Sequence, residues 1–387
     1  MRSFSMKKNQ TLKIGLVFDD SLDSNDGVQQ YVKTLGGWLM DQGHEVRFLV
    51  GETRDSGRFQ EYVYSLSRNI TIKGNQNKMF LPFFSSSKEI QKALDAEDFD
   101  VLHIMMPCNP LMGSRVIRRS GDIPVLGSFH MVGGTFIVNQ GARLLKLVQS
   151  NTLKHVDHFL SVSAAAQAFE RKYFGIESEV SPNMVDMSAF ASGEPKEFLK
   201  GENGTITFLG RLVERKGTIH LLEAARILHQ QGRLDGVRIN ICGDGELRAE
   251  LEEFVRNHQL QDNVMFHGFI DEAEKGDFLA SADVTVYPAT GGEAFGIVLV
   301  EAMSTGRSVV LGGDNAGYRT VLGGREDLLF DPSNHEALAQ KIDHYLNDKR
   351  SANAAIKWQL NEVKQYDVNE VGKDMVHRYR MAIEAKR

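Results

Sequence analysis

Short runs of β-branched and other apolar residues alternate along most of the chain with segments whose apolar positions recur at helical spacing. In the first half, residues 28–42 place Val28, Val32, Leu35 and Leu39 on one side of a predicted helix. Such alternation is typical of βα units that build a parallel sheet. The first half is therefore predicted to contain one sheet, with strands at 13–18, 45–50, 101–105, 124–129 and 158–162.

The second half shows the same alternation and no short internal repeat. Between the two halves, residues 181–203 are rich in proline, glycine and polar side chains, which is typical of an interdomain linker. The second set is predicted to have strands at 205–209, 238–241, 264–266, 284–287 and 308–311, and helices at 219–231, 247–257, 277–280 and 297–303.

The expected fold class is α/β, with two Rossmann-like doubly wound domains facing a central cleft. Ligands of such sheets bind at the carboxyl ends of the strands, so function is sought there. The predicted divisions are a first domain at 1–185, a linker at 186–203, a second domain at 204–365, and a C-terminal helix at 366–387 that returns to the first domain.

Composition narrows the functional class. The 387 residues are 42% hydrophobic and 25% charged, which is ordinary globular usage, and the net charge of −6 argues against a nucleic-acid-binding protein. The two cysteines, Cys108 and Cys242, are too few for a disulfide framework or a thiol zinc site, so we expect a cytoplasmic protein. No apolar stretch approaches the length of a bilayer span, so any membrane contact is expected to be peripheral.

The most informative motif is the glycine-rich block 291–303, which follows a predicted strand and opens a helix near Gly296. Free backbone N–H groups and the helix dipole at that point favour an anion. Glu293 precedes the helix and Glu301 lies inside it, so the two carboxylates can hold different parts of a polyhydroxylated ligand. One glutamate alone is more simply a solvated helix residue, but the whole block favours a ligand site.

A second motif, 208–217, follows the first predicted strand of the second domain. Arg211 and Lys216 flank a tight glycine turn, where each can form charge-assisted bonds to a diphosphate. The alternative is a basic loop exposed to solvent, and we expect that role for Arg215.

The first domain offers weaker signals. Gly27 and Gln29 lie where the first strand leads into an amphipathic helix, and a glycine there lets the backbone approach a ligand. His130 follows a strand and can donate to a sugar hydroxyl, although single histidines are more often structural.

Several other chemistries lack their signatures. The sequence has no phosphate-binding P-loop and no Gly-x-Gly-x-x-Gly after the first strand, which argues against nucleotide hydrolysis and NAD chemistry. His155 and His158 have no Glu or Cys partner that suggests a metal. The Asp98-Phe99-Asp100 pair precedes a strand and so lies at the wrong end of the sheet.

The spacing of Glu293 and Glu301 resembles the Glu-x7-Glu signature of retaining GT-B glycosyltransferases of family GT4. The motifs that carry this resemblance occur in the family's order over nearly the whole chain: 210–211, 216–217, 243–247, 267–268, 281–284 and 291–303. Within the family, 291–303 and 98–104 are most similar to phosphatidylinositol mannosyltransferases.

The resemblance implies roles for single residues. Arg211 and Lys216 would hold the donor diphosphate, Glu301 the ribose, and Glu293 and His130 the transferred sugar. It implies no side-chain nucleophile, no protein-bound metal and no obligatory cofactor, with Mg²⁺ at most stimulatory. The remaining donor contacts implied by the family are Gly27, Gln29 and the block Phe295, Gly296, Ile297 and Val298, with Phe269, Ile270 and Lys275 beside the base.

The chain departs from the family at three places. Asp26-Gly27 replaces a Gly-Gly pair, and Met184 replaces the glycine of a Pro-Asn-Gly-Val-Asp motif. The acceptor-facing segment is less basic than in its relatives and carries only Arg68, Lys73, Lys78, Lys88 and Lys92. The donor chemistry therefore carries over better than the acceptor.

The leading interpretation is a transferase that moves a hexose, as mannose from GDP-mannose, onto a lipid acceptor such as phosphatidylinositol. The alternatives are a UDP-sugar transferase acting on diacylglycerol or on a soluble sugar or polyol, and a non-catalytic nucleotide-sugar-binding protein. The joint presence of five residues argues against a non-catalytic binding protein: Glu293, Glu301, Arg211, Lys216 and His130.

Residues 65–92 are a candidate for contact with an anionic membrane surface, at the inner face of the cell membrane. This segment has five basic residues and one acidic residue, with four apolar residues in its middle: Phe80, Leu81, Phe83 and Phe84. The competing interpretation is that these four are core residues of the first domain.

Overall fold

The computed structural model describes residues 11–23, 26–74, 77–133 and 136–387, and side chains in these ranges except at 69–74, 77–84 and 136–143. The chain divides into two compact units. The first comprises Met1–Met184 together with Val368–Arg387, and the second comprises Val185–Asp367. Residues 186–203, the expected linker, belong to the second unit, where they form α6 (Met187–Ala191) and a short 3₁₀ turn (Glu197–Leu199).

The first unit contains an eight-stranded sheet in the order β4-β3-β2-β1-β5-β6-β7-β8. Neighbouring strands are parallel except β3 and β4, which pair antiparallel. The strands are β1 (Lys13–Phe18), β2 (Glu45–Gly51), β3 (Val63–Gly74), β4 (Asn77–Ser85), β5 (Val101–Met105), β6 (Val125–Phe129), β7 (His158–Ser161) and β8 (Glu179–Val180).

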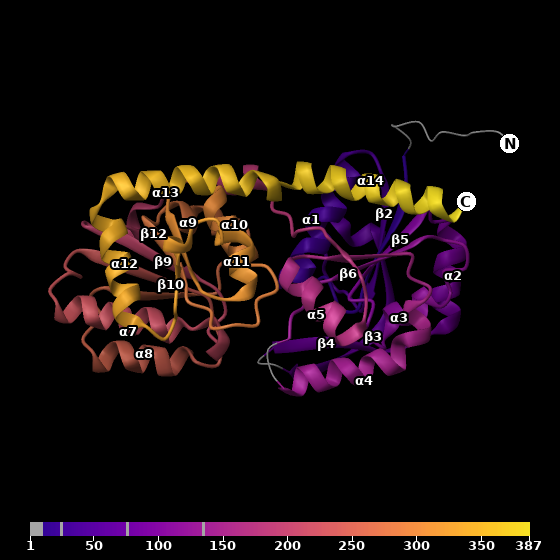
Figure 1. Ribbon diagram of the computed structural model, residues 1–387, viewed down its shortest axis with the longest axis horizontal. Helices are drawn as coiled ribbons and strands as arrows, with labels where there is room; N and C mark the ends of the chain where they lie inside the picture. Colours follow the sequence, from indigo (N-terminus) through magenta and orange to yellow (C-terminus); the bar gives the residue numbers. More distant parts are fainter. Residues whose placement is uncertain (1–10, 24–25, 75–76, 134–135) are drawn as a thin grey trace. The chain divides into compact units, whose positions relative to one another are not determined.

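Helices cover both faces of this sheet (Figure 1). Alternate residues of β1 point to opposite faces, so Leu16 packs against α1 and α14 while Val17 packs with α2 and α3. The helices are α1 (Gly27–Asp41), α2 (Ser87–Glu97), α3 (Met112–Ile117), α4 (Phe136–Leu153), α5 (Ala164–Phe174) and α14 (Val368–Lys386).

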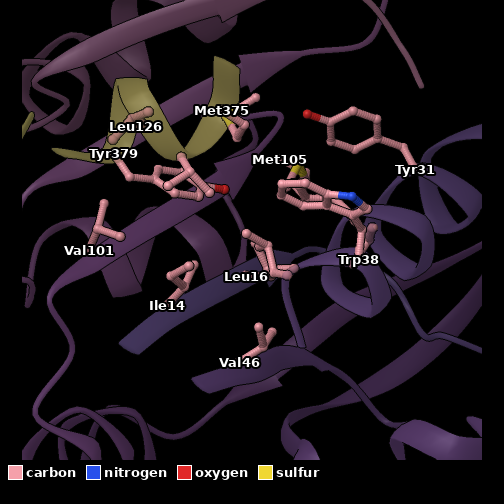
Figure 2. Packing of buried hydrophobic residues seen from close by; sticks show 14 of the residues in the cluster. Ile14, Leu16, Tyr31, Trp38, Val46, Val101, Met105, Leu126, Met375 and Tyr379 are labelled. Carbon is pink, nitrogen blue, oxygen red and sulfur yellow. The ribbon is translucent and has the colours of Figure 1, made fainter. Parts of the chain in front are cut away.

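The C-terminal helix α14 is part of the first unit. Met375 and Tyr379 of α14 enter the same buried cluster as Trp38 of α1 and Leu16 of β1 (Figure 2). The Trp38 indole also donates to the Asn369 side chain over 3.0 Å. Burial of large apolar side chains therefore holds the last helix on the sheet.

The second unit contains a six-stranded sheet in the order β11-β10-β9-β12-β13-β14, with all pairs parallel. Numbered within the unit, this is the Rossmann order 3-2-1-4-5-6, which changes direction between β9 and β12. The strands are β9 (Gly204–Leu209), β10 (Val237–Cys242), β11 (Val264–Gly268), β12 (Val284–Tyr287), β13 (Val309–Gly313) and β14 (Leu329–Phe330).

Seven further helices belong to the second unit, on both faces of its sheet (Figure 1). They are α7 (Thr218–Gln230), α8 (Arg248–Asn257), α9 (Lys275–Ala280), α10 (Ile297–Ser304), α11 (Ala316–Leu322), α12 (His335–Asn347) and α13 (Lys349–Glu362). The two doubly wound units confirm the predicted α/β class. The sequence pattern did not predict β3, β4, β8 and β14.

Candidate active site

The two sequence motifs of the second unit follow β9 and β12, the strands on either side of the topological switch point. The Thr290 N–H donates to the Arg215 carbonyl over 3.0 Å, which joins the two loops. Gly217 has φ +70°, and a Cβ there would lie 2.1 Å from the Pro288 carbonyl oxygen. A glycine is therefore required for the loops to approach this closely.

Glu293 is the centre of a buried ion cluster. One of its carboxylate oxygens, Oε1, lies 2.6 Å from Arg215 Nη1 and 2.8 Å from Lys216 Nζ. Burial alone would raise the pKa of Glu293, but the Lys216 and Arg215 cations outweigh it, so the pKa lies below its ordinary value. Glu293 is thus an ionised acceptor at neutral pH.

The expectation that Arg215 is a solvent-exposed loop residue is wrong. Its side chain is only 25% exposed and forms the shortest contact to Glu293. The loop brings Arg215 inward because the 3₁₀ turn Glu214–Lys216 places it beside the β12 loop. The sequence feature that could have indicated this inward position is that Arg215 lies next to Lys216 in the same motif.

Helix α10 begins at Ile297, a few residues after Glu293 in the sequence. Gly296 caps the helix with φ +113°, and a Cβ there would meet the Tyr318 ring at 2.8 Å. Phe295 is buried and packs edge-on against Tyr366, which anchors the turn. The first N–H groups of a helix have no partner within it, so those that begin at Ile297 and Val298 suit a phosphate or a sugar oxygen.

Glu301, farther along α10, is buried and lies 3.6 Å from Lys275 Nζ. Lys275 also contacts Glu272 at 2.8 Å. Burial favours the neutral amine, but Glu301 and Glu272 outweigh it and raise the pKa of Lys275. The pair can therefore present a fixed carboxylate to ribose hydroxyls.

The remaining predicted donor residues lie at the same carboxyl edge. Phe269, just after β11, has a 74% exposed side chain that is free to stack on a base, whereas Ile270 is buried. Arg211 follows β9 and is half-buried. The adjacent Leu212 N–H donates to the Asp244 carbonyl over 3.0 Å, so the β9 and β10 loops are also joined.

In the first unit, Gly27 begins α1 and is exposed, and a Cβ there would meet no atom within 4 Å. Gln29 is buried two residues later. The Asp26 side chain makes no capping bond to the helix. The backbone at Gly27 is thus open to a ligand, while the Gln29 side chain faces the interior.

His130 follows β6 and packs edge-on against Tyr31, with 4.7 Å between the ring centres. Burial lowers the pKa of His130 to about 4, and a hydrogen bond with the Asn183 side chain acts in the opposite direction. The imidazole is therefore neutral at pH 7, so it can donate one hydrogen bond and accept another.

A buried polar network lies behind His130. His103 Nδ1 lies 2.8 Å from the Tyr379 hydroxyl, and its Nε2 lies 2.5 Å from the Ser128 hydroxyl. Burial lowers the pKa of His103 to about 3, so this histidine is also neutral. Because Ser128 precedes His130 by two residues, the network connects α14 to the strand that carries His130.

Two buried carboxyl groups of the first unit were missed by the sequence analysis. Asp19, directly after β1, accepts from the Gly113 N–H over 2.6 Å, and burial raises its pKa to about 7. Glu170 accepts from the hydroxyls of Ser161 and Ser178, and burial also raises its pKa to about 7. An acidic residue immediately after a buried strand was a usable signal for Asp19.

Within the described ranges, no group of three or more His, Cys, Asp or Glu side chains could hold a metal ion. Over the same part of the chain, no helix is both long enough and apolar enough to span a membrane.

Two family models match the chain. The model "Glycosyltransferase Family 4" matches residues 25–189, and "Glycosyl transferases group 1" matches residues 193–359. The chain is 31% identical to a phosphatidyl-myo-inositol mannosyltransferase of Mycolicibacterium smegmatis over 95% of its length and 93% of the relative's. It is 24% identical to an alpha-monoglucosyldiacylglycerol synthase of Streptococcus pneumoniae over 78% of its length and 71% of that protein's.

Among solved structures, Anabaena HepE in complex with UDP and glucose matches 95% of this chain and 99% of its own, with a TM-score of 0.71 and 19% identity. At that identity the likeness concerns the fold, which is GT-B. Together with the full-length relative and the two family models, it shows that the chain belongs to glycosyltransferase family 4 and is a glycosyltransferase.

Proposed function

We propose that this protein is a retaining hexosyltransferase that transfers mannose from GDP-mannose to a phosphatidylinositol-type lipid. The observation that carries the proposal is the buried cluster of Glu293, Arg215 and Lys216 at the switch point of the second sheet. A relative named as a phosphatidyl-myo-inositol mannosyltransferase, aligned over almost the whole chain, supports this choice of substrates.

The cluster suits the departure of a nucleoside diphosphate. In this proposal, Lys216 and Arg211 bind the diphosphate, and the N–H groups at the start of α10 add further donors. These charges stabilise the leaving group as the bond from the anomeric carbon to the donor oxygen breaks. Glu293 stays ionised and accepts from hydroxyls of the sugar, while Glu301 accepts from the ribose.

The acceptor oxygen then bonds to the anomeric carbon on the face from which the diphosphate leaves, which retains the anomeric configuration. The acceptor proton passes to a diphosphate oxygen, so no side-chain nucleophile takes part. Neutral His130 contributes a hydrogen bond to the sugar, and its low pKa keeps it uncharged throughout the physiological range. No cofactor is obligatory, and added Mg²⁺ is at most stimulatory.

The second candidate is transfer from a UDP-sugar to diacylglycerol or to a soluble sugar or polyol. Two findings favour it: the monoglucosyldiacylglycerol synthase among the relatives and the UDP complex of the matching HepE structure. In either case, the proposal places the protein in the cytoplasm, and with a lipid acceptor it acts at the inner face of the cell membrane. Contact of the segment 65–92 with that surface stays a prediction, since six of its side chains lie outside the described ones: Lys73, Lys78, Phe80, Leu81, Phe83 and Phe84.

A ligand panel separates the two candidates. Thermal unfolding is measured with GDP, UDP, ADP and their sugars, because a ligand that binds only the native state raises the midpoint. The donor that stabilises is then supplied with vesicles containing phosphatidylinositol or diacylglycerol. Stabilisation by GDP and a mannolipid with the donor's anomeric configuration are expected; UDP selectivity with a glucosyl- or N-acetylglucosaminyl-diacylglycerol product would reverse the ranking.

A further inference from the structure

Met106, the residue that follows β5, has a left-handed backbone with φ +57°. Two other non-glycine residues in the described ranges share this conformation, Asp98 and Gln259, and each lies at or just beyond the end of a helix. A left-handed residue is an ordinary way to end a helix, whereas Met106 follows a strand. Because a Cβ makes this conformation unfavourable, the surroundings of Met106 must hold it there.

The next residue in the chain adds to the strain. A proline pushes the residue before it toward extended backbone, so Pro107 works against the left-handed conformation of Met106. Pro107 is itself buried and lies against β6, since a Cβ at Gly127 would come within 2.7 Å of the Pro107 Cγ atom. The turn after β5 therefore packs closely against β6, the strand that leads to His130.

Three hydrogen bonds fix Met106, and two of them join it to the chain at the end of β6. The Met106 N–H donates to the Ser128 carbonyl over 2.8 Å, and the Met106 carbonyl accepts from the Asn109 N–H over 3.0 Å. The His130 N–H donates to the Met106 sulfur over 3.2 Å. Met106 thus holds residues 128 and 130 together, the first through its main chain and the second through its side chain.

The imidazole of His130 has one atom left for a ligand. Its ring packs against Tyr31, and the side chain of Asn183 forms a hydrogen bond with it. The His130 Nε2 atom is buried and has no hydrogen-bond partner among the described residues. A buried polar atom without a partner is costly, so Nε2 suits a hydroxyl group of a ligand. The direction of the ring depends on the His130 backbone, which the Met106 sulfur holds.

We propose that Met106 is a positioning residue for sugar transfer: its left-handed backbone and its sulfur hold the main chain at His130 so that Nε2 faces the transferred sugar. The Met106 side chain also packs against the buried cluster that contains Cys108 and Phe129, which fixes the position of the sulfur. Strained residues persist at functional sites where the surrounding structure over-determines them. The proposal rests on the proposed function for the role of His130 at the sugar.

The test compares two replacements of similar size in the full-length protein, Met106→Leu and Met106→Gln. Leucine keeps the apolar contacts but cannot accept a hydrogen bond, whereas the glutamine amide oxygen can. The leucine variant should lose roughly 10- to 100-fold in kcat, the scale of a misplaced group, with donor KM unchanged within about twofold. The glutamine variant should be the more active of the two and the less stable, because its amide lies in apolar surroundings.

The order of the two variants separates positioning from stability. If Met106 were only structural, turnover would follow the unfolding midpoint, and the glutamine variant would be the less active one. That order, or a leucine variant with the kcat of the wild type, would overturn the proposal. Met105→Leu is the matched control and should keep the kcat of the wild type, since the buried Met105 side chain lies in the other cluster, with Leu16 and Tyr379 (Figure 2).

Titration of His130 provides a readout that does not depend on activity. Burial lowers the pKa of His130 to about 4 in the native protein. Met106→Leu should raise this pKa toward the ordinary value of 6.5, because a ring that is no longer held gains contact with water. Met105→Leu should leave it unchanged. NMR of labelled histidine measures both, and an unchanged His130 titration in the Met106→Leu variant contradicts the proposal.

Failure of the proposed function is recognised separately. All variants are compared with the wild type on the sugar nucleotide that the wild type consumes and with the same acceptor, so the ratios of kcat apply to GDP-mannose and to a UDP-sugar alike. A wild type that consumes only UDP-sugars refutes GDP-mannose as the donor and leaves the test of Met106 intact. An unimpaired Met106→Leu variant on the accepted donor refutes the role of Met106 alone.

Discussion

Glu293 of the second unit and two buried carboxyl groups of the first unit, Asp19 and Glu170, have opposite electrostatic surroundings. In the second unit, Glu293 is held by Arg215 and Lys216, and its pKa is lowered. In the first unit, Asp19 and Glu170 accept hydrogen bonds only from uncharged groups among their described contacts, and burial raises the pKa of each to about 7.

The difference shows that burial by itself does not determine the charge of a carboxyl group. Two adjacent cations reverse the effect of desolvation, whereas one amide or two hydroxyls reduce it without reversing it. The second unit is thus built to keep fixed charges where a diphosphate and a sugar are expected. In the first unit, Glu97 is likewise paired, with Lys13 and Arg47, and its pKa is lowered to about 2. Protonatable Asp19, by contrast, follows β1, and neutral His130 follows β6.

The largest effect is expected for Glu293→Gln. The change replaces the ionised acceptor for the sugar with a neutral and weaker one, and it leaves Arg215 and Lys216 available to bind a diphosphate. Turnover should fall by roughly 100- to 1,000-fold, the usual scale for one preorganised electrostatic group, while affinity for the nucleoside diphosphate is kept or increased. Steady-state kinetics and calorimetry measure the two quantities, and a variant that loses nucleotide affinity but keeps turnover would contradict the assigned role.

Arg211→Ala and Glu301→Ala should act on binding instead. Each removes a proposed charge-assisted contact to the donor nucleotide, worth about 1.5 to 3 kcal/mol, or roughly 10- to 150-fold in affinity. Calorimetric titration with GDP and UDP checks this. Arg233→Ala, which removes an exposed arginine paired with Asp343 on the second unit, serves as a control. Unchanged nucleotide affinity in both variants would contradict the assignment of Arg211 and Glu301 to the donor site.

Asp19→Asn tests the protonatable side of the comparison. Because the folded pKa of Asp19 is raised from 3.8 to about 7, its stabilising effect is complete below pH 4 and is lost as the pH rises to about 7. The variant should therefore gain stability relative to the wild type by about 1.4 kcal/mol per pH unit in this window and no more above it. Urea unfolding at several pH values measures this; parallel curves would contradict it.

Glu293 provides the control for that experiment, with the opposite sign. Its lowered pKa means that its stabilisation is present above the ordinary value of 4.5 and is lost only as the pH falls below it. The difference between Glu293→Gln and the wild type should consequently stay constant between pH 5 and 8. A slope in that window would show that the ion cluster is not ionised in the native protein.

Tyr379→Phe should have the smallest effect. It leaves His103 Nδ1 buried without the hydroxyl now 2.8 Å away, at a cost of about 1 kcal/mol in unfolding free energy. Tyr345→Phe, which removes a partly exposed hydroxyl bound to Asp327, is a comparison from the second unit and should cost less. If the network also positions His130, turnover should fall in the first variant with little change in donor KM, and equal kinetics in both would restrict the network to stability.

Local pattern was sufficient for the central strands. Residues 13–18, 101–105 and 284–287 were predicted with the bounds that the structure gives, because strands buried on both faces form continuous apolar runs. The antiparallel pair β3 and β4 and the two-residue strands β8 and β14 were missed, whereas the edge strand β11 was predicted. β3 mixes polar and apolar residues beside its antiparallel partner, and β8 and β14 are too short to show a period.

By itself, the sequence determined the two doubly wound sheets, the family and the block around Glu293, since these depend on residue type and spacing within short segments. Tertiary structure alone decided that Arg215 turns inward and that Asp19 is shielded from water. It also decided that Leu144, Leu147 and Val148 are exposed to water. Desolvation and charge pairing act through space between residues distant in the chain. Apolar residues at helical spacing, such as Leu144, Leu147 and Val148, are therefore compatible with either a buried or an exposed helix face. Only the residues that pack around the helix decide which of the two it is.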